Sequence, residues 1–187
     1  MFADAARNVG IAWRLARFDA TAARDFEDDD RAFWRSFRAL PIVMALDWLV
    51  SSLTVSAFQE DGGGIGRAPL ATGWLVVGWL LALNIAAEFA RHMKRQDFWP
   101  RYVIAHNWAA LVQGGVLTVG IAALGIFGAP SDAYGFWVVV VGFWSLVYDW
   151  FIVKSALEVE GPPAALLMVI LLFTALFVNQ IAASFAG

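Results

Sequence analysis

The sequence predicts an all-α integral membrane protein, a bundle of five transmembrane helices preceded by an amphipathic N-terminal helix. Five long apolar stretches alternate with short polar segments, and each is about long enough to cross the roughly 30 Å hydrocarbon layer as a helix. Hydrophobic residues make up 60% of the 187 residues and charged residues 16%, which is below the roughly 25% charged residues of soluble domains. The stretches cover approximately residues 39–58, 70–90, 102–127, 134–153 and 164–185.

The positions of these stretches divide the chain into two parts. Residues 1–38 are expected to form a cytoplasmic or interfacial helical segment, and residues 39–187 the five-helix transmembrane domain. One bundle is expected because five spans use most of the chain and leave no length for a second core. The sequence contains no cysteine, which excludes disulfides, thiolate metal sites and thiol nucleophiles.

The N-terminal segment has the pattern of an amphipathic helix. Over residues 2–18, polar or small residues recur at steps of three and four, while aromatic and aliphatic residues occupy the other faces. Such a helix suits the headgroup boundary, where arginines bind anionic lipid phosphates. Docking on the cytoplasmic face of the bundle is an alternative of equal weight. The residues expected to contact headgroups are Arg7, Arg14, Arg17, Arg35 and Arg38.

Two connecting segments resemble ligand-binding loops. The acidic run over residues 25–30 lacks the ligand spacing and the turn glycine of a calcium loop, so we interpret it as a solvated linker or helix cap. The glycines of residues 62–66 have no preceding strand and no Lys-Ser/Thr pair, and we interpret them as a flexible turn.

The distribution of positive residues predicts the orientation. The connection over residues 59–67 has two carboxylates and one Arg, whereas residues 91–101 contain four Arg or Lys residues and one His. Because positive residues flank spans on the cytoplasmic side, the second connection and the N-terminus are expected inside, and the C-terminus outside.

Several strongly polar side chains lie within the predicted spans. A polar group in the hydrocarbon layer is costly unless it is paired or faces a wet interior. Asp47, Glu88, His106 and Asp149 fall in the middle-to-cytoplasmic half of the bilayer, so they are expected to be able to meet. The full predicted cluster is Asp47, Asn84, Glu88, His106, Asn107, Gln113 and Asp149.

Three interpretations of this cluster stay open. The first is a hydrogen-bond network that holds the bundle together. The second is a proton or cation path, or a small-molecule pocket, in which His106 titrates between carboxylates. The third is metal binding, which the scattered spacing of one His and three carboxylates disfavours. We expect no metal, no cofactor and no catalytic residue.

The third span carries small residues at every fourth position. Another helix can approach closely over such a stripe, so this span is expected to be central. The stripe consists of Ala110, Gly114, Thr118 and Ala122.

Three segments give the chain a resemblance to a known family. They are LARFDATAARDFEDDDRAFWRSF, RYVIAHNWAALVQ and YDWFIVKSALEVEGPPAAL. With them, the chain resembles uncharacterised alphaproteobacterial membrane proteins that are similar to the Yip-type five-span family. The resemblance implies five spans and a cytoplasmic N-terminus, and eukaryotic members of the family act as membrane-traffic adaptors. The family's Asp-Leu-Tyr-Gly-Pro sequence is absent ahead of the first span, so no site residue is transferred.

Together these observations predict a multi-pass protein of the bacterial inner membrane, with its C-terminus in the periplasm. The expected function is that of a scaffold, assembly or membrane-organising factor that acts through protein or lipid contacts. The alternative is a small transporter or channel-like subunit that uses the polar cluster, and a membrane-embedded enzyme is third. The expected partners are the bilayer and its anionic lipids, with other membrane proteins or a second copy as further candidates, and no nucleic acid.

Overall fold

The computed structural model describes residues 2–27, 29–58 and 64–186, and all elements in these ranges are helical. The all-α prediction is confirmed. Three short elements come first: α1 (Phe2–Ala16), the 3₁₀ helix η1 (Ala20–Asp25) and α2 (Asp30–Ser36). The long helices are α3 (Ala39–Phe58), α4 (Gly64–His92), α5 (Trp99–Ile126), α6 (Ser131–Ala156) and α7 (Gly161–Ala186), and the 3₁₀ turn η2 (Gln96–Phe98) precedes α5.

Helix α3 matches its predicted stretch, residues 39–58, whereas α4, α6 and α7 extend beyond theirs at both ends and α5 extends at its start. Helix α5 begins three residues before residue 102, because Pro100 in its first turn has a helical φ angle and needs no hydrogen-bond partner for its nitrogen. Helix α4 begins at Gly64, so Gly64 and Gly66 of the predicted glycine turn are helical. Glycine is tolerated there because the first N–H groups of a helix have no partner within the helix. Residues 62 and 63 of that predicted turn lie outside the described residues.

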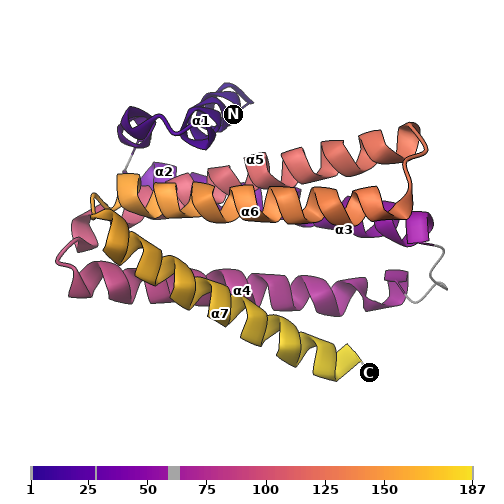
Figure 1. Cartoon of the computed structure of the whole chain (residues 1–187). Helices are drawn as coiled ribbons and strands as arrows, with labels where there is room; N and C mark the ends of the chain where they lie inside the picture. The colour runs from indigo at the N-terminus through magenta and orange to yellow at the C-terminus, as the bar shows by residue number, and fades with distance from the viewer. Residues whose placement is uncertain (1, 28, 59–63, 187) are drawn as a thin grey trace.

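Helix α5 lies at the centre of the bundle. It contacts α1, α2, α3, α4 and α6, whereas α7 packs against α4 and α6 (Figure 1). A Cβ atom added to Gly114 would lie 3.3 Å from the Leu46 side chain of α3, so the small-residue stripe does admit a neighbouring helix. The α4–α5 and α6–α7 connections lie at the same end of the bundle, together with α2 and η1 (Figure 1).

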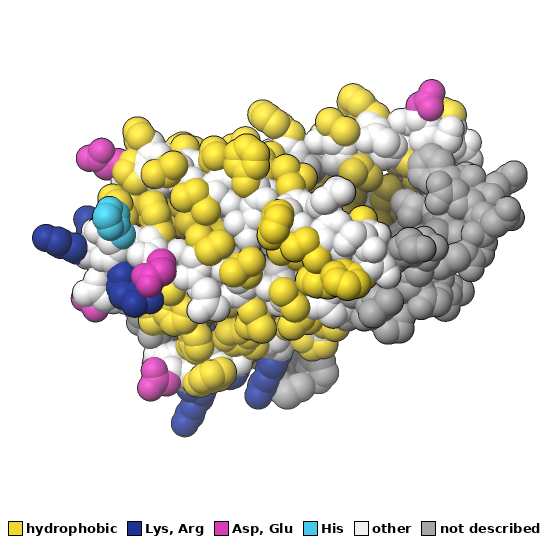
Figure 2. Space-filling model, turned by 90° about the horizontal axis from the view of Figure 1, so that it is seen from below, with side chains coloured by type: hydrophobic (Ala, Val, Ile, Leu, Met, Phe, Trp, Pro, Cys, Tyr) yellow, Lys and Arg dark blue, Asp and Glu magenta, His cyan; other side chains and the backbone are white. Residues whose placement is uncertain are grey.

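The surface of the bundle is apolar over most of its length. Large side chains are more than two-thirds exposed along α5 and α6, among them Val119 (70%), Phe136 (71%) and Phe143 (70%). Seen from the α4–α7 side, hydrophobic side chains cover the middle, and charged side chains gather mainly at one end (Figure 2). Five helical segments are long and apolar enough to cross a bilayer. This is the architecture of a multi-pass membrane protein.

The N-terminal segment docks on the bundle. Helix α1 buries Ile11, Ala12 and Leu15 and packs against α5 and α6. The Tyr148 hydroxyl of α6, itself buried, donates a 2.5 Å hydrogen bond to the Ala12 carbonyl. Of the two sequence-based alternatives for this helix, docking on the bundle is the one that the described contacts support.

Candidate functional site

Six of the seven predicted polar residues divide among three places, and His106 packs separately against aromatic rings. The first is a cavity between α3, α5 and α6, the second a buried hydrogen-bonded chain near α2, and the third a groove between α4 and α7. The expected meeting of Asp47, Glu88, His106 and Asp149 does not occur as one cluster. The reason is the rotation of α4, which places Glu88 on its exposed side, where it pairs with Arg91 at 3.1 Å.

The cavity has a volume of about 310 Å³. Its polar lining comes from three helices: Asp47 on α3, Gln113 on α5 and Ser145 on α6. The Gln113 side-chain amide donates a 2.9 Å hydrogen bond to Asp149 Oδ1, which connects the second intramembrane carboxylate to the cavity wall. Asp47 is exposed and has no hydrogen-bond or ionic partner among residues 3–27, 29–54 and 73–185, whose side chains the structure describes.

A buried chain of hydrogen bonds joins three helices. The Trp79 indole of α4 donates to Asn107 Oδ1 at 3.0 Å, and Asn107 Nδ2 donates to the Ser36 hydroxyl at 2.8 Å. Ser36 in turn donates to the Phe33 carbonyl at 2.7 Å. Asn107 and Ser36 are fully buried. Because every polar atom of this chain is engaged inside the bundle, we assign it a structural role.

His106 packs between aromatic rings. Its ring lies 5.6 Å from the Trp79 ring and 5.7 Å from the Tyr102 ring, the latter in a stacked arrangement. No carboxylate of the described chain lies within ion-pair distance of it. The second interpretation of the cluster required His106 to titrate between carboxylates, and these contacts give it no such partner.

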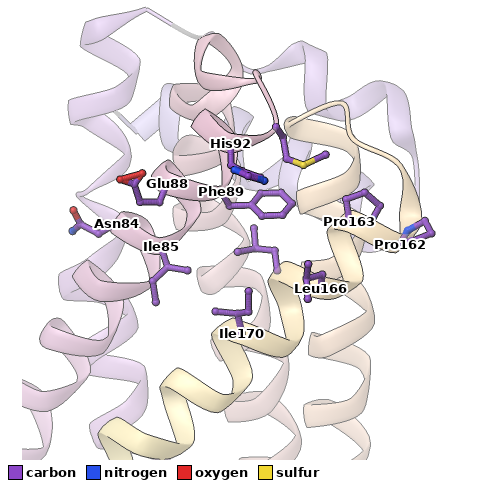
Figure 3. Close-up of a pocket in the computed structure, with 11 residues that line it drawn as sticks. Asn84, Ile85, Glu88, Phe89, His92, Pro162, Pro163, Leu166 and Ile170 are labelled. Atoms are coloured by element: carbon purple, nitrogen blue, oxygen red, sulfur yellow. The ribbon is translucent and has the colours of Figure 1, made fainter.

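The groove between α4 and α7 is the larger hollow, about 930 Å³ in volume. Phe89, Leu166 and Ile170 lie between the two helices (Figure 3), and Asn84, Glu88 and His92 of α4 supply the polar part of the lining. Farther along, the two helices contact each other through Trp74 and Phe185, whose rings stack at 5.7 Å. The groove itself lies at the end that holds the α4–α5 and α6–α7 connections (Figure 1).

Ion pairs tie α1 to the acidic run. Glu27 accepts from Arg7 at 2.5 Å and from Arg35 at 3.1 Å. Arg14 pairs with Asp19 at 2.7 Å and with Asp25 at 2.5 Å. The Thr21 hydroxyl and the Arg14 guanidinium lower the pKa of Asp19 to about 2. The acidic run also supplies a helix cap, because the side chain of Asp29 accepts from the Ala32 N–H at 2.6 Å.

These ion pairs divide the five arginines predicted to contact headgroups into two groups, those with an internal partner and those without one. Arg7, Arg14 and Arg35 bind carboxylates of the chain, and Arg35 also pairs with Asp4 at 2.9 Å. Arg17 and Arg38 are exposed and have no ion-pair partner in the part of the chain that the structure describes. Only these two guanidinium groups of the predicted set are therefore open to a phosphate without breaking an internal pair.

Metal ligands do not gather in the described residues. No group of three His, Asp or Glu side chains there is arranged to hold a metal ion. The residues that the predicted cluster did not include are Ser36, Trp79 and Ser145, which complete the hydrogen-bonded chain and the cavity. Trp79 gave no signal because its indole N–H looks like any other aromatic position in an apolar span.

Comparisons with protein-family models, with curated proteins and with solved structures gave no match to this chain.

Proposed function

We propose that this multi-pass protein acts within the membrane through protein or lipid contacts, as a scaffold, assembly or membrane-organising factor. The proposed setting is a bacterial inner membrane, with the N-terminus in the cytoplasm and the C-terminus in the periplasm, as the positive-inside pattern and the resemblance to the Yip-type family favour. The observation that supports this function best is the groove between α4 and α7.

The groove suits contact rather than chemistry. Its walls are mostly apolar, and its volume of about 930 Å³ is near the upper end of the range for ligand sites. Its polar lining consists of Asn84, Glu88 and His92, all on α4, and α7 contributes no polar side chain to it. The Asn84 side-chain nitrogen donates a 2.7 Å hydrogen bond to the Leu80 carbonyl of its own helix. A membrane-embedded enzyme would need polar groups that converge inside the groove, so it remains the third hypothesis.

Site-specific photo-crosslinking in native membranes tests this proposal. A photoreactive residue at Leu166 or Ile170 in the groove is compared with one at Phe143, which is 70% exposed on α6. We expect the groove positions to give a discrete protein adduct, or a lipid adduct enriched over the bulk composition, and Phe143 to give bulk lipid only. Identical adducts at all three positions would contradict a contact function of the groove.

A small transporter or channel-like subunit is the second candidate. The cavity beside Asp47 favours it, because a carboxylate within a span marks an ion or substrate pathway by default. If Asp47 carries an exchangeable proton, Asp47→Asn should abolish pH-dependent uptake into proteoliposomes while the variant stays as stable as the parent. Unchanged uptake would remove this candidate.

Anionic lipids are the proposed partners of the cytoplasmic end. Arg17 and Arg38 support this proposal, because both guanidinium groups are exposed and unpaired within the described residues. Each basic residue near an anionic surface contributes about 1 kcal/mol of attraction. The ion pairs of Arg7, Arg14 and Arg35 keep these three residues in internal contacts instead.

A further inference from the structure

Three polar side chains from three helices converge on the cavity between α3, α5 and α6. Asp47 contributes a carboxylate, Gln113 an amide and Ser145 a hydroxyl, while the remaining lining is apolar. A small, mostly apolar cavity with a few convergent polar groups is the usual form of a ligand site. Its volume of about 310 Å³ lies at the lower end of that class.

The carboxylate of Asp47 differs from the other two carboxylates in the spans. Glu88 pairs with Arg91 at 3.1 Å, and Asp149 accepts from Gln113 at 2.9 Å. Asp47 has no such partner among the described residues. An ionised carboxylate within a span is costly unless it is paired, so the chemistry that the site lacks is a positive charge or a hydrogen-bond donor.

The charge around the cavity also favours a cation. The described lining holds no Arg, Lys or His. Asp149 adds a second carboxylate directly behind Gln113, at 2.9 Å from the amide nitrogen. The Gln113 side-chain oxygen accepts no hydrogen bond within the described residues, so it is available to a donor group of an occupant.

The side chains that line the cavity offer too few oxygen ligands to favour a bare metal ion. Calcium takes six to eight oxygen ligands, and magnesium needs near-octahedral coordination. The lining offers one carboxylate, one amide and one hydroxyl, and no three metal-ligating side chains gather among the described residues. An ammonium group needs only about three acceptors for its three N–H bonds, and its carbon chain would contact the apolar walls.

We propose that the cavity between α3, α5 and α6 binds a small organic cation, an alkylammonium ion with a short apolar body, whose charge pairs with Asp47. The cavity lies apart from the α4–α7 groove, and this binding does not depend on the contact function proposed for that groove.

The test uses the purified full-length protein and three probes of similar size, 2-phenylethylammonium, the neutral 2-phenylethanol and the anionic phenylacetate, together with two further ammonium ions, butylammonium and cyclohexylmethylammonium. Binding is followed by the concentration-dependent rise of the unfolding temperature, because a ligand that binds only the folded state stabilises it. We expect a saturable rise with the ammonium ion alone. Equal shifts with the alcohol, or no shift with 2-phenylethylammonium, butylammonium and cyclohexylmethylammonium, would overturn the proposal.

Matched variants locate the site. Asp47→Asn should weaken 2-phenylethylammonium binding at least about tenfold, because one partner of a close charge pair is lost. Glu88→Gln makes the same chemical change outside the cavity and should leave the affinity unchanged. Equal affinities of these two variants would show that Asp47 does not bind the cation.

A second variant tests the cavity without removing the charge. Gly142 lines the cavity, and no atom lies within 4 Å of a Cβ placed on it. Gly142→Leu should therefore fold, fill the space and abolish the ammonium-dependent shift. Retained binding in this variant would contradict the location. Because the readout is a ligand effect on the isolated protein, failure here is distinct from failure of the crosslinking test of the α4–α7 groove.

Discussion

Gly120 of α5 leaves room for the Trp137 side chain of α6. A Cβ atom added at Gly120 would overlap the indole ring of Trp137 on α6. That ring is held in place because its N–H donates to the Leu117 carbonyl at 3.3 Å. In Gly120→Ala the indole must move and lose this hydrogen bond, or the two helices must separate.

Gly120→Ala is expected to lower the free energy of unfolding by a moderate amount. Overpacking a filled site costs about 1–3 kcal/mol, and a lost hydrogen bond in a membrane adds about 0.6 kcal/mol. Alanine regains at most about 1 kcal/mol of helix propensity over glycine. We therefore expect Gly120→Ala to lower the free energy of unfolding by about 1–2 kcal/mol.

Gly115 supplies the matched control on the same helix. No atom lies within 4 Å of a Cβ placed on Gly115, so Gly115→Ala should be neutral or stabilising by up to about 1 kcal/mol. The assay is reversible unfolding in mixed detergent micelles, followed by circular dichroism, with tryptophan fluorescence as a second probe. If Gly120→Ala is as stable as Gly115→Ala, the packing described between α5 and α6 is wrong.

Three further predictions concern the buried chain, the ion pairs and the lipid contacts. Asn107→Leu leaves the Trp79 indole and the Ser36 hydroxyl without their shared partner and should lower the free energy of unfolding by about 1–3 kcal/mol, which the same micelle assay measures; a stable variant would remove the structural role. The depressed pKa of Asp19 means that its contribution is present at neutral pH and is lost as pH falls toward about 2, so the hydrogen-exchange protection factors of α1, corrected for the intrinsic rate at each pH, should fall over that acid range, and Asp19→Asn should lack this fall. Arg17→Gln combined with Arg38→Gln should reduce the enrichment of anionic lipid that co-purifies with the protein, as measured by mass spectrometry, whereas enrichment equal to that of the parent would assign the lipid contact to other residues.

The five helices were predictable because each one is marked by a long run of apolar residues. Each span must be apolar on nearly all sides in lipid, and long runs such as residues 164–185 show this directly. The central position of α5 was also predictable, because the small residues around Gly114 leave room for Leu46 of α3. Both features follow from single segments of the chain and need no knowledge of their partners.

The division of the polar residues was not predictable in the same way. Whether Asp47, Gln113 and Asp149 share a site depends on how three helices are rotated about their axes. Because these helices are apolar on nearly all sides, their sequences do not indicate which side faces the bundle. The bond between Ser36 and Asn107 joins residues 71 positions apart. The arginines of α1 and the acidic run each look like solvated charges alone, and only their docked geometry pairs them.

The membrane topology tests the central claim most directly. Because the chain contains no cysteine, single cysteines can be placed at Lys94 in the α4–α5 connection, at Asp132 at the start of α6, and at Gly187. With a membrane-impermeant maleimide applied to intact spheroplasts, we predict labelling of Asp132→Cys and Gly187→Cys, and labelling of Lys94→Cys only after the membrane is disrupted. Labelling of Lys94→Cys from outside, or protection of Gly187→Cys, would contradict the five-span account.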